Sequence, residues 1–181
     1  MGDWNIIKTG SYESGVERSH QYRYLCARGF VDPTDIVIDA SCGCGYGTEI
    51  LSMKAKKAIG IDRDQRAILH AMEHHKRDNN YFMELNLDQV DGLPECDVAV
   101  SIETIEHLRF PKSFASKLKL AARKKIFVTC PIVPTKHEDP THLHDFTISE
   151  LNELFVDENW ASIDGSIQGI YLLASFYRKG K

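Results

Sequence analysis

The sequence predicts an α/β fold in which the strands of a mostly parallel sheet alternate with helices. Two short apolar segments, 36–38 (IVI) and 58–61 (AIGI), are typical of buried strands, and each is followed directly by an acid, Asp39 or Asp62. A glycine-rich turn and a helical stretch come after the first strand. Since ligands of open α/β sheets bind beyond the carboxyl ends of the strands, both acids are expected at a binding site.

The remaining elements follow from periodicity and from helix-terminus signals. Gly29 ends the first helix, and Thr147 with Glu150 predicts a capping box at the start of the last one. The proline-rich segment 131–140 is expected to be a loop, because proline cannot donate to a sheet. The expected helices span residues 17–29, 48–56, 64–77, 112–122 and 147–155; the expected strands span residues 36–38, 58–62, 81–85, 97–102, 126–129, 162–167 and 170–177.

Length and composition indicate a single folded domain. The chain has 181 residues, of which 43% are hydrophobic, and this is enough to bury one substantial core. We expect a flexible leader over residues 1–16 and one domain over residues 17–181. The net charge of −4 argues against a protein whose whole surface is built to bind nucleic acid.

The cysteines and the apolar segments bear on location. The five cysteines have no C-x-x-C spacing and are expected to be free thiols in a reducing compartment: Cys26, Cys42, Cys44, Cys96 and Cys130. No apolar run approaches the length of a membrane span, and the first residues lack the apolar core of a signal peptide. We therefore expect a cytoplasmic protein with no membrane partner.

Segment 41–47 (SCGCGYG) is the strongest candidate for a binding loop. Glycine tolerates positive φ and has no Cβ, so the backbone of such a loop can approach a ligand closely. Its spacing is G-x-G-x-G, whereas loops that bind dinucleotide phosphates have the spacing G-x-G-x-x-G. The acid at position 39 would repel phosphates, but it can accept hydrogen bonds from an ammonium group. The loop therefore favours a nucleoside that carries an amino acid over NAD.

Three motifs together resemble a known family. Asp39 with SCGCGYG, then GIDRD at 60–64, then DVAVSIETIEHL at 97–108 resemble the class I S-adenosylmethionine-dependent methyltransferases. The resemblance extends from about residue 17 to the end of the chain. It implies a Rossmann-like, three-layer α/β sandwich with a seven-stranded, mostly parallel sheet whose last strand is antiparallel. It also implies S-adenosyl-L-methionine as the cofactor.

The resemblance assigns roles to particular residues. Asp62 is expected to bind the ribose hydroxyls, since an acid about 20 residues beyond the glycine loop has this role in related folds. Asn86 and Leu87 are expected to contact the adenine, and Arg18 or Arg23 the carboxylate of the methionine part. The full set of expected cofactor-binding residues is Asp39, Ser41, Gly43, Gly45, Tyr46, Asp62, Arg63, Asn86, Leu87, Ser101 and Glu103.

The reaction needs few catalytic groups. A sulfonium methyl is already activated, so the protein mainly aligns it with the acceptor, and an oxygen or nitrogen acceptor must also lose a proton. His107, His142 and His144 are the candidate bases, because imidazole titrates near neutral pH. We expect the reaction to need no metal. The histidines at 70, 74 and 75 are attributed to a surface helix rather than to a metal site.

The acceptor is expected to be a small molecule or a glycan-related compound, and the sequence leaves the oligomeric state open. A second candidate is a metal-dependent RNA 3′-end 2′-O-methyltransferase. Glu103, Glu106, His107 and His142 or His144 match the ligand types of that family, and on a helix Glu103 and Glu106 would share a face. The sequence is also compatible with a non-catalytic module that binds S-adenosylmethionine, and less so with an NAD-binding oxidoreductase.

Overall fold

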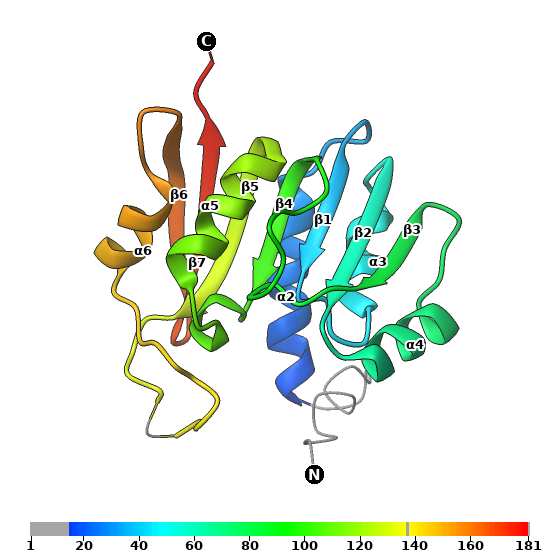
Figure 1. The fold of residues 1–181 in the computed structure, drawn as a ribbon, viewed down its shortest axis with the longest axis horizontal. Helices are drawn as coiled ribbons and strands as arrows, with labels where there is room; N and C mark the ends of the chain where they lie inside the picture. Colours follow the sequence, from blue (N-terminus) through cyan, green and yellow to red (C-terminus); the bar gives the residue numbers. More distant parts are fainter. Residues whose placement is uncertain (1–14, 137, 181) are drawn as a thin grey trace. The chain divides into compact units, whose positions relative to one another are not determined.

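A computed structural model gives the fold of residues 15–136 and 138–180 (Figure 1). The described residues form a seven-stranded sheet with the strand order β3-β2-β1-β4-β5-β7-β6. The chain divides into two compact units, of which the first ends at Asn86 and the second begins at Leu87. Residues 1–14 of the expected leader lie outside the described residues, and residues 15 and 16 belong to the first described helix. The single domain over residues 17–181 stays a prediction.

The first unit alternates helices and parallel strands. Its elements are α2 (Gly15–Gly29), β1 (Ile36–Ala40), α3 (Tyr46–Ser52), β2 (Lys57–Asp62), α4 (Gln65–His74) and β3 (Asn80–Glu84). Strand β2 pairs in parallel with both β1 and β3. Helix α3 packs on β1 and β2, α4 packs on β2 and β3, and α2 packs on α3. The carboxyl ends of β1 and β2 therefore lie side by side.

The ends of the helices in this unit depend partly on distant residues. Helix α4 begins at Asp64, whose side chain accepts a hydrogen bond from the backbone N–H of Arg66. Helix α3 ends at Ser52, four residues before the predicted end. The side-chain amide of Asn79 donates to the carbonyls of Ser52 and Ala55, at 2.9 Å each, and so satisfies acceptors at this terminus.

The second unit contains the remaining four strands. Its elements are β4 (Cys96–Ile102), the single 3₁₀ turn η1 (Ile105–His107), α5 (Pro111–Ala121), β5 (Ala122–Pro131), α6 (Ile148–Phe155), β6 (Trp160–Gln168) and β7 (Tyr171–Arg178). Strand β4 is buried at every position and pairs in parallel with β5. Strand β7 is antiparallel to both β5 and β6. Helix α6 begins with the predicted capping box, in which Thr147 and Glu150 bond each other reciprocally.

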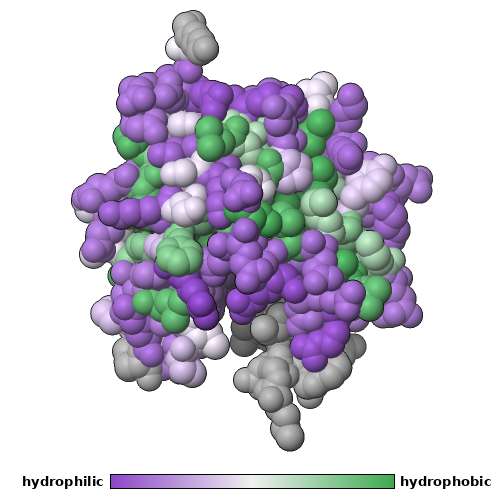
Figure 2. Space-filling view, in the orientation of Figure 1, coloured by the Kyte–Doolittle hydropathy of each residue, from purple (hydrophilic) through white to green (hydrophobic). Residues whose placement is uncertain are grey.

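The fold class predicted from the sequence is confirmed. The sheet is mixed and mostly parallel, helices accompany it, and the last strand in the chain is antiparallel to its neighbours. Strand β5 is longer than predicted, because all of its residues from Lys125 to Pro131 pair with β7. Hydrophilic residues cover much of the face drawn in Figure 2, with hydrophobic patches between them. Within the described ranges, no helix is long and apolar enough to cross a membrane.

Candidate functional site

In the first unit, the carboxylate of Asp39 connects three elements. It lies at the end of β1 and has no exposed surface. Its two oxygens accept hydrogen bonds from the Tyr24 hydroxyl on α2 at 3.1 Å and from the Thr48 hydroxyl on α3 at 2.7 Å. Burial raises the pKa of Asp39 to about 7, although these two hydrogen bonds oppose the shift. The acid before the loop therefore fixes the framework around the expected ammonium site.

A group of aromatic rings fills the space between α2 and α3. The rings of His20, Tyr24 and Tyr46 lie with their centroids 5.4 to 5.8 Å apart, and Nδ1 of His20 is hydrogen-bonded to the Tyr46 hydroxyl. Burial, and secondarily the charge of Arg23, lowers the pKa of His20 to about 4, so this imidazole is neutral at physiological pH. A Cβ added at Gly47 would lie 2.1 Å from the Tyr24 ring. Only glycine at position 47 leaves room for this contact.

The backbone of the loop between β1 and α3 alternates between left-handed and other conformations. Ser41, Gly43 and Gly45 have φ values of 72°, 52° and 94°, so three of five successive residues are left-handed. A non-glycine residue in this region costs roughly 1 to 3 kcal/mol, and at Ser41 the cost is offset by two hydrogen bonds. The backbone N–H groups of Ser41 and Cys42 both donate to the Ile61 carbonyl, at 2.8 and 2.9 Å. The loop is thus attached to the end of β2.

Gly45 is constrained by space as well as by φ. A Cβ there would lie 2.4 Å from the Ala71 side chain and 2.9 Å from the Phe82 ring. At Gly43, by contrast, an added Cβ would meet no atom within 4 Å. Position 43 therefore requires glycine only for its φ, and position 45 requires it for two reasons.

The carboxylate of Asp62, at the end of β2, is fixed by backbone groups on both sides. One oxygen accepts from the N–H of Gly43 and the other from the N–H of Asp64, each at 2.9 Å. The acid expected to bind ribose therefore also holds the glycine loop against the start of α4. A carboxylate has about four acceptor positions, so further donors can still bind to it.

The remaining expected contacts of this unit differ in burial. Arg23 is 2% exposed and donates to the Ser19 hydroxyl at 2.9 Å, whereas Arg18 and Arg63 are exposed. Asn86, after β3, is half-buried. Leu85, just before it, donates its N–H to the carbonyl of Asp62 at 2.8 Å. Arg23 is thus the better placed of the two arginines for contact with an enclosed ligand group.

The second unit begins with Leu87, whose carbonyl accepts from the Nζ of Lys117 at 2.9 Å. Lys117 lies on α5 and is buried, although the lysines of this helix would be expected at its solvent-exposed face from the sequence. Asp88 accepts from the backbone N–H of Arg109. Both contacts fix the start of this unit, and nothing in the sequence around position 117 indicates the first of them.

The end of β4 carries Ser101 and Glu103. Ser101 is fully buried, and within the described residues its hydroxyl has no hydrogen-bond partner. Glu103 has a φ of 49°, and its N–H donates to the Thr129 carbonyl at 3.1 Å. The turn η1 starts two residues later, so Glu103 and Glu106 are not on one helix face. The condition for a shared face, a helix that includes both residues, is therefore not met.

The loop after β5 is attached to η1 by backbone contacts. The carbonyl of Glu106 accepts from the N–H groups of Leu143 and His144, at 2.8 and 3.1 Å. The Nε2 of His144 is 3.0 Å from the carbonyl of Leu108. Since a carbonyl only accepts, this nitrogen carries the proton, and His144 serves as an attachment point for the loop. Such a contact cannot be read from the local sequence.

The rings of His107 and His142 meet edge to face, with centroids 4.6 Å apart and an interplanar angle of 75°. The Nδ1 of His107 lies 3.1 Å from both the carbonyl and the hydroxyl of Thr141. The Nδ1 of His142 is 2.7 Å from the Thr135 hydroxyl, and its Nε2 is 3.6 Å from Asp139. The carbonyl of Thr141 requires a proton on Nδ1 of His107, which leaves the lone pair of the neutral ring on Nε2.

Three of these side chains form a compact cluster, which we call the 106–107–142 cluster. One ligand atom each from Glu106, His107 and His142 lies within 4.8 Å of the others, and Glu106 is 1% exposed. Cys130 on β5 is also buried, and burial, with the Glu106 charge as a second cause, raises the pKa of its thiol. The structure therefore brings together His107 and His142 of the predicted set, whereas Glu103 and His144 lie outside the cluster.

The histidines near the end of α4 have partners of a different kind. Nδ1 of His75 is 2.8 Å from the Glu49 carboxylate, and His75 is buried rather than on the surface. The rings of His70 and His74 lie 4.3 Å apart, and burial lowers the pKa of His70. In the part of the chain that the structure describes, these three do not make a metal-binding group.

The comparisons with known proteins agree with these features. A family model for a methyltransferase domain matches residues 38–125, which include the glycine loop, both strand-end acids and β4. A protein of Mycobacterium tuberculosis, whose name assigns it to the S-adenosylmethionine-dependent methyltransferases, is 28% identical over 137 residues, 70% of this chain. The family model, the curated relatives and the solved structures together support a class I S-adenosylmethionine-dependent methyltransferase. S-adenosylmethionine is the cofactor of this family.

Two further similarities extend over different parts of this chain. The mitochondrial ubiquinone biosynthesis O-methyltransferase of Dictyostelium discoideum is 33% identical over 96 residues, 45% of this chain and 30% of that protein. The magnesium protoporphyrin IX methyltransferase of Synechocystis, solved with S-adenosylhomocysteine, has a TM-score of 0.73 at 16% identity. That similarity spans 97% of this chain and 93% of the other, and it concerns the fold. The chain spans about half the length, 49%, of its mycobacterial relative.

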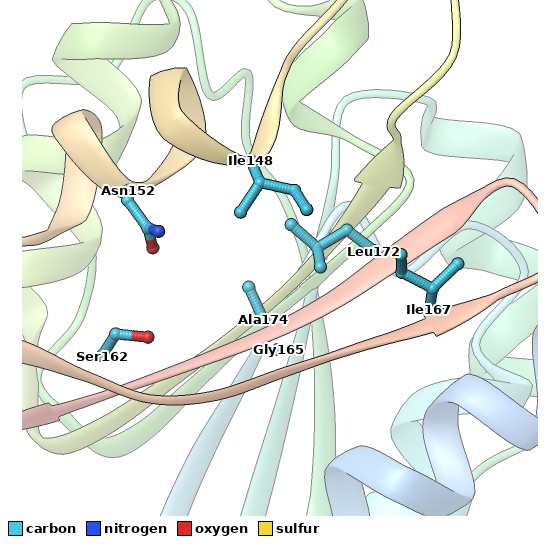
Figure 3. A pocket seen from close by; sticks show the side chains of 7 residues that line it. All are labelled: Ile148, Asn152, Ser162, Gly165, Ile167, Leu172 and Ala174. Carbon is cyan, nitrogen blue, oxygen red and sulfur yellow. The ribbon is translucent and has the colours of Figure 1, made fainter.

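The second unit of the chain also has a small surface pocket (Figure 3). Figure 3 shows Ile148 and Asn152 of α6 opposite Leu172 and Ala174 of β7, with Ser162 and Ile167 of β6 beside them. Its volume of about 190 Å³ is smaller than that of ordinary ligand pockets, which begin near 300 Å³. None of the predicted site residues lines it, so we do not assign it to the reaction.

Proposed function

We propose that this chain transfers the methyl group of S-adenosylmethionine to an oxygen or nitrogen of a small-molecule or glycan-related acceptor. The observation that supports this proposal most is the hydrogen-bonded contact between the glycine loop and Asp62. The carboxylate of Asp62 accepts from Gly43, and the left-handed residues around it turn backbone N–H groups towards the end of β2. Such a contact suits the binding of a nucleoside, whose ribose hydroxyls would donate hydrogen bonds to Asp62.

The amino acid part of the cofactor would lie nearer β1 and α2. The sulfonium compound carries an ammonium and a carboxylate, and Asp39 and Arg23 are groups of the matching charge. Arg23 is the proposed partner of the carboxylate because it is buried, whereas Arg18 is exposed. Tyr24 and Thr48 would position Asp39 without touching the cofactor.

A small acceptor is favoured by the names of two similar proteins and by the charge. Ubiquinone biosynthesis and magnesium protoporphyrin IX both concern small molecules, and the chain has a net charge of −4, which does not favour RNA. The five cysteines are free, in keeping with a reducing, cytoplasmic location. RNA stays the second candidate for the acceptor.

The 106–107–142 cluster is the proposed place where the acceptor proton is handled. It combines two imidazoles with a buried carboxylate in one group. His144 is a weaker candidate for this role, because its Nε2 is engaged with the Leu108 carbonyl.

The test is methyl transfer from labelled S-adenosylmethionine to three acceptor classes: phenols and amines, sugar hydroxyls, and RNA with a free 3′ end. We expect formation of S-adenosylhomocysteine with a compound of the first two classes, and none without an acceptor. The Asp62→Ala variant serves as the control for background transfer. If calorimetry shows that the chain binds NAD but not S-adenosylmethionine, the proposal is wrong. If only RNA is methylated, the acceptor class is wrong.

A further inference from the structure

We propose that Glu106, His107 and His142 bind a divalent transition-metal ion. This differs from the metal-free reaction that the sequence favours. The proposal concerns residues of the second unit alone, and the binding of the ion does not depend on the cofactor or on the acceptor.

The first argument is distance. The ligand atoms of the three side chains lie within 4.8 Å of one another. Bonds from a zinc-like ion to nitrogen and oxygen are about 2.0 to 2.2 Å long, so atoms that share one ion lie about 3 to 4 Å apart. An ion would therefore have to draw the three atoms together by up to about 1 to 2 Å. Glu103 and His144 lie outside the group, so the described residues supply three ligands to the site.

The second argument is the support behind each imidazole. Ligand histidines usually donate their other ring N–H to a carbonyl, carboxylate or water, and this fixes the ring and the tautomer. The Nδ1 of His107 faces the Thr141 carbonyl, and the Nδ1 of His142 faces the Thr135 hydroxyl. Asp145 holds Thr135 in turn, because its carboxylate accepts from the Thr135 N–H at 2.8 Å. Both rings are therefore fixed by hydrogen bonds at Nδ1.

The third argument is burial of charge. The Glu106 side chain is 1% exposed, and a carboxylate at that depth is stabilised by positive charge close to it. A divalent ion bound by two imidazoles as well supplies such charge. The backbone of Glu106 is fixed independently, since its carbonyl accepts from both Leu143 and His144.

The donor set indicates the kind of ion. Two imidazoles and one carboxylate suit Zn²⁺, Fe²⁺ or Ni²⁺, whereas Mg²⁺ prefers oxygen ligands alone. With the three ligands that the described residues supply, a coordination position would stay open, as in catalytic zinc sites. If the proposed function holds, an acceptor hydroxyl that binds there would lose its proton more readily. This last step rests on the proposed function, but the site itself does not.

The experiment measures metal binding by the full chain after removal of metals with EDTA. Calorimetric titration with Zn²⁺, and with Mg²⁺ for comparison, is followed by desalting and elemental analysis. We expect one Zn²⁺ per chain and much weaker binding of Mg²⁺. His107→Ala and His142→Ala should each weaken Zn²⁺ binding by about 100-fold or more, since loss of an outer partner alone costs about 10- to 100-fold. Thr135→Val, which removes only the hydroxyl beside His142, should weaken it by about 10-fold.

The matched control is His74→Ala, which removes a half-exposed histidine outside the cluster and should leave Zn²⁺ binding unchanged. Circular dichroism and S-adenosylmethionine binding check that each variant is folded. The proposal is overturned if the wild-type chain retains no ion. It is also overturned if folded His107→Ala and His142→Ala bind Zn²⁺ as the wild type does, or if His74→Ala loses as much. Intact Zn²⁺ binding without methyl transfer to any acceptor would support the site and count against the proposed function alone.

Discussion

The glycine loop and the 106–107–142 cluster are built in opposite ways. Beside the loop, at the ends of β1 and β2, both oxygens of Asp39 and both oxygens of Asp62 already accept hydrogen bonds from the chain itself. In the cluster, hydrogen bonds hold the histidine rings through Nδ1, and three ligand atoms lie within 4.8 Å of one another.

The difference shows how the two sites would work. The loop is cross-linked to its surroundings by hydrogen bonds, and the two strand-end acids take part in these bonds. The cluster is held by residues of the loop after β5, namely Thr135, Thr141 and Asp145. Variants of the loop should therefore change cofactor affinity and leave Zn²⁺ affinity as it is, whereas variants of the cluster should do the reverse.

The largest effect is expected from Gly45→Val. Its side chain would overlap Ala71 and Phe82 and would also adopt a disfavoured φ, so S-adenosylmethionine binding should be abolished in a folded chain. Gly43→Ala is the matched control, because it meets only the φ cost of roughly 1 to 2 kcal/mol. Calorimetry and circular dichroism measure both. Normal binding by a folded Gly45→Val chain would mean that this loop does not hold the cofactor.

A smaller but still large effect is expected from Asp62→Ala. The variant loses the charge-assisted contacts to ribose and the bond to Gly43, so cofactor affinity should fall by about 1.5 to 3 kcal/mol. Asp64→Ala removes the neighbouring helix cap instead, and it should lower stability by about 1 kcal/mol while affinity stays the same. Equal affinity losses in the two variants would show that the effect comes from disorder of the segment.

The two arginines of α2 provide a third comparison. Arg23→Gln should weaken cofactor binding by about 1.5 to 3 kcal/mol if the buried guanidinium meets the carboxylate. Arg18→Gln should have no measurable effect. Titration with S-adenosylmethionine and with the decarboxylated cofactor tests the role directly, since only the first carries the carboxylate. A loss of equal size for both ligands argues against this contact.

The smallest effects concern pH. The pKa of Asp39 is raised to about 7, so the folded state binds the extra proton and its stability falls as pH rises from 5 to 8. The pKa of His20 is lowered to about 4, so its contribution is lost as pH falls below about 6.5 and recovers as pH rises. Between pH 5 and 8, the stability of Asp39→Asn should therefore rise more than that of the wild-type chain. The stability of His20→Gln should rise less than that of the wild-type chain. Each difference should be on the order of 2 kcal/mol. Urea unfolding at the two pH values measures this, and identical slopes in the three proteins would contradict it.

Much of the first unit could be predicted from the sequence, because its signals are local. The glycine spacing and the strand-end acids lie within a few residues of the structures they determine, as does the capping box of Thr147 in the second unit. The end of α3 could not be predicted, because it depends on the side chain of Asn79. Segment 103–108 reads as helical, but the left-handed Glu103 reduces it to one 3₁₀ turn.

The candidate site in the second unit could be predicted only in part. His107 and His142 could be named as candidates, but their meeting depends on the contacts of Glu106 with Leu143 and His144. Those contacts join segments far apart in the sequence and leave no mark in either one. The buried Lys117 is a similar case, because its acceptor is a backbone carbonyl.

The contact between Tyr24 and Gly47 has a consequence for how this protein opens. The ring of Tyr24 occupies the space where a side chain at position 47 would be, and its hydroxyl holds Asp39. Helix α2 and the glycine loop therefore cannot separate independently, and they form one cooperative unit of local unfolding. Backbone amides of residues 41–47 should exchange hydrogen with solvent at the rate set by detachment of α2, and Tyr24→Ala should accelerate both together.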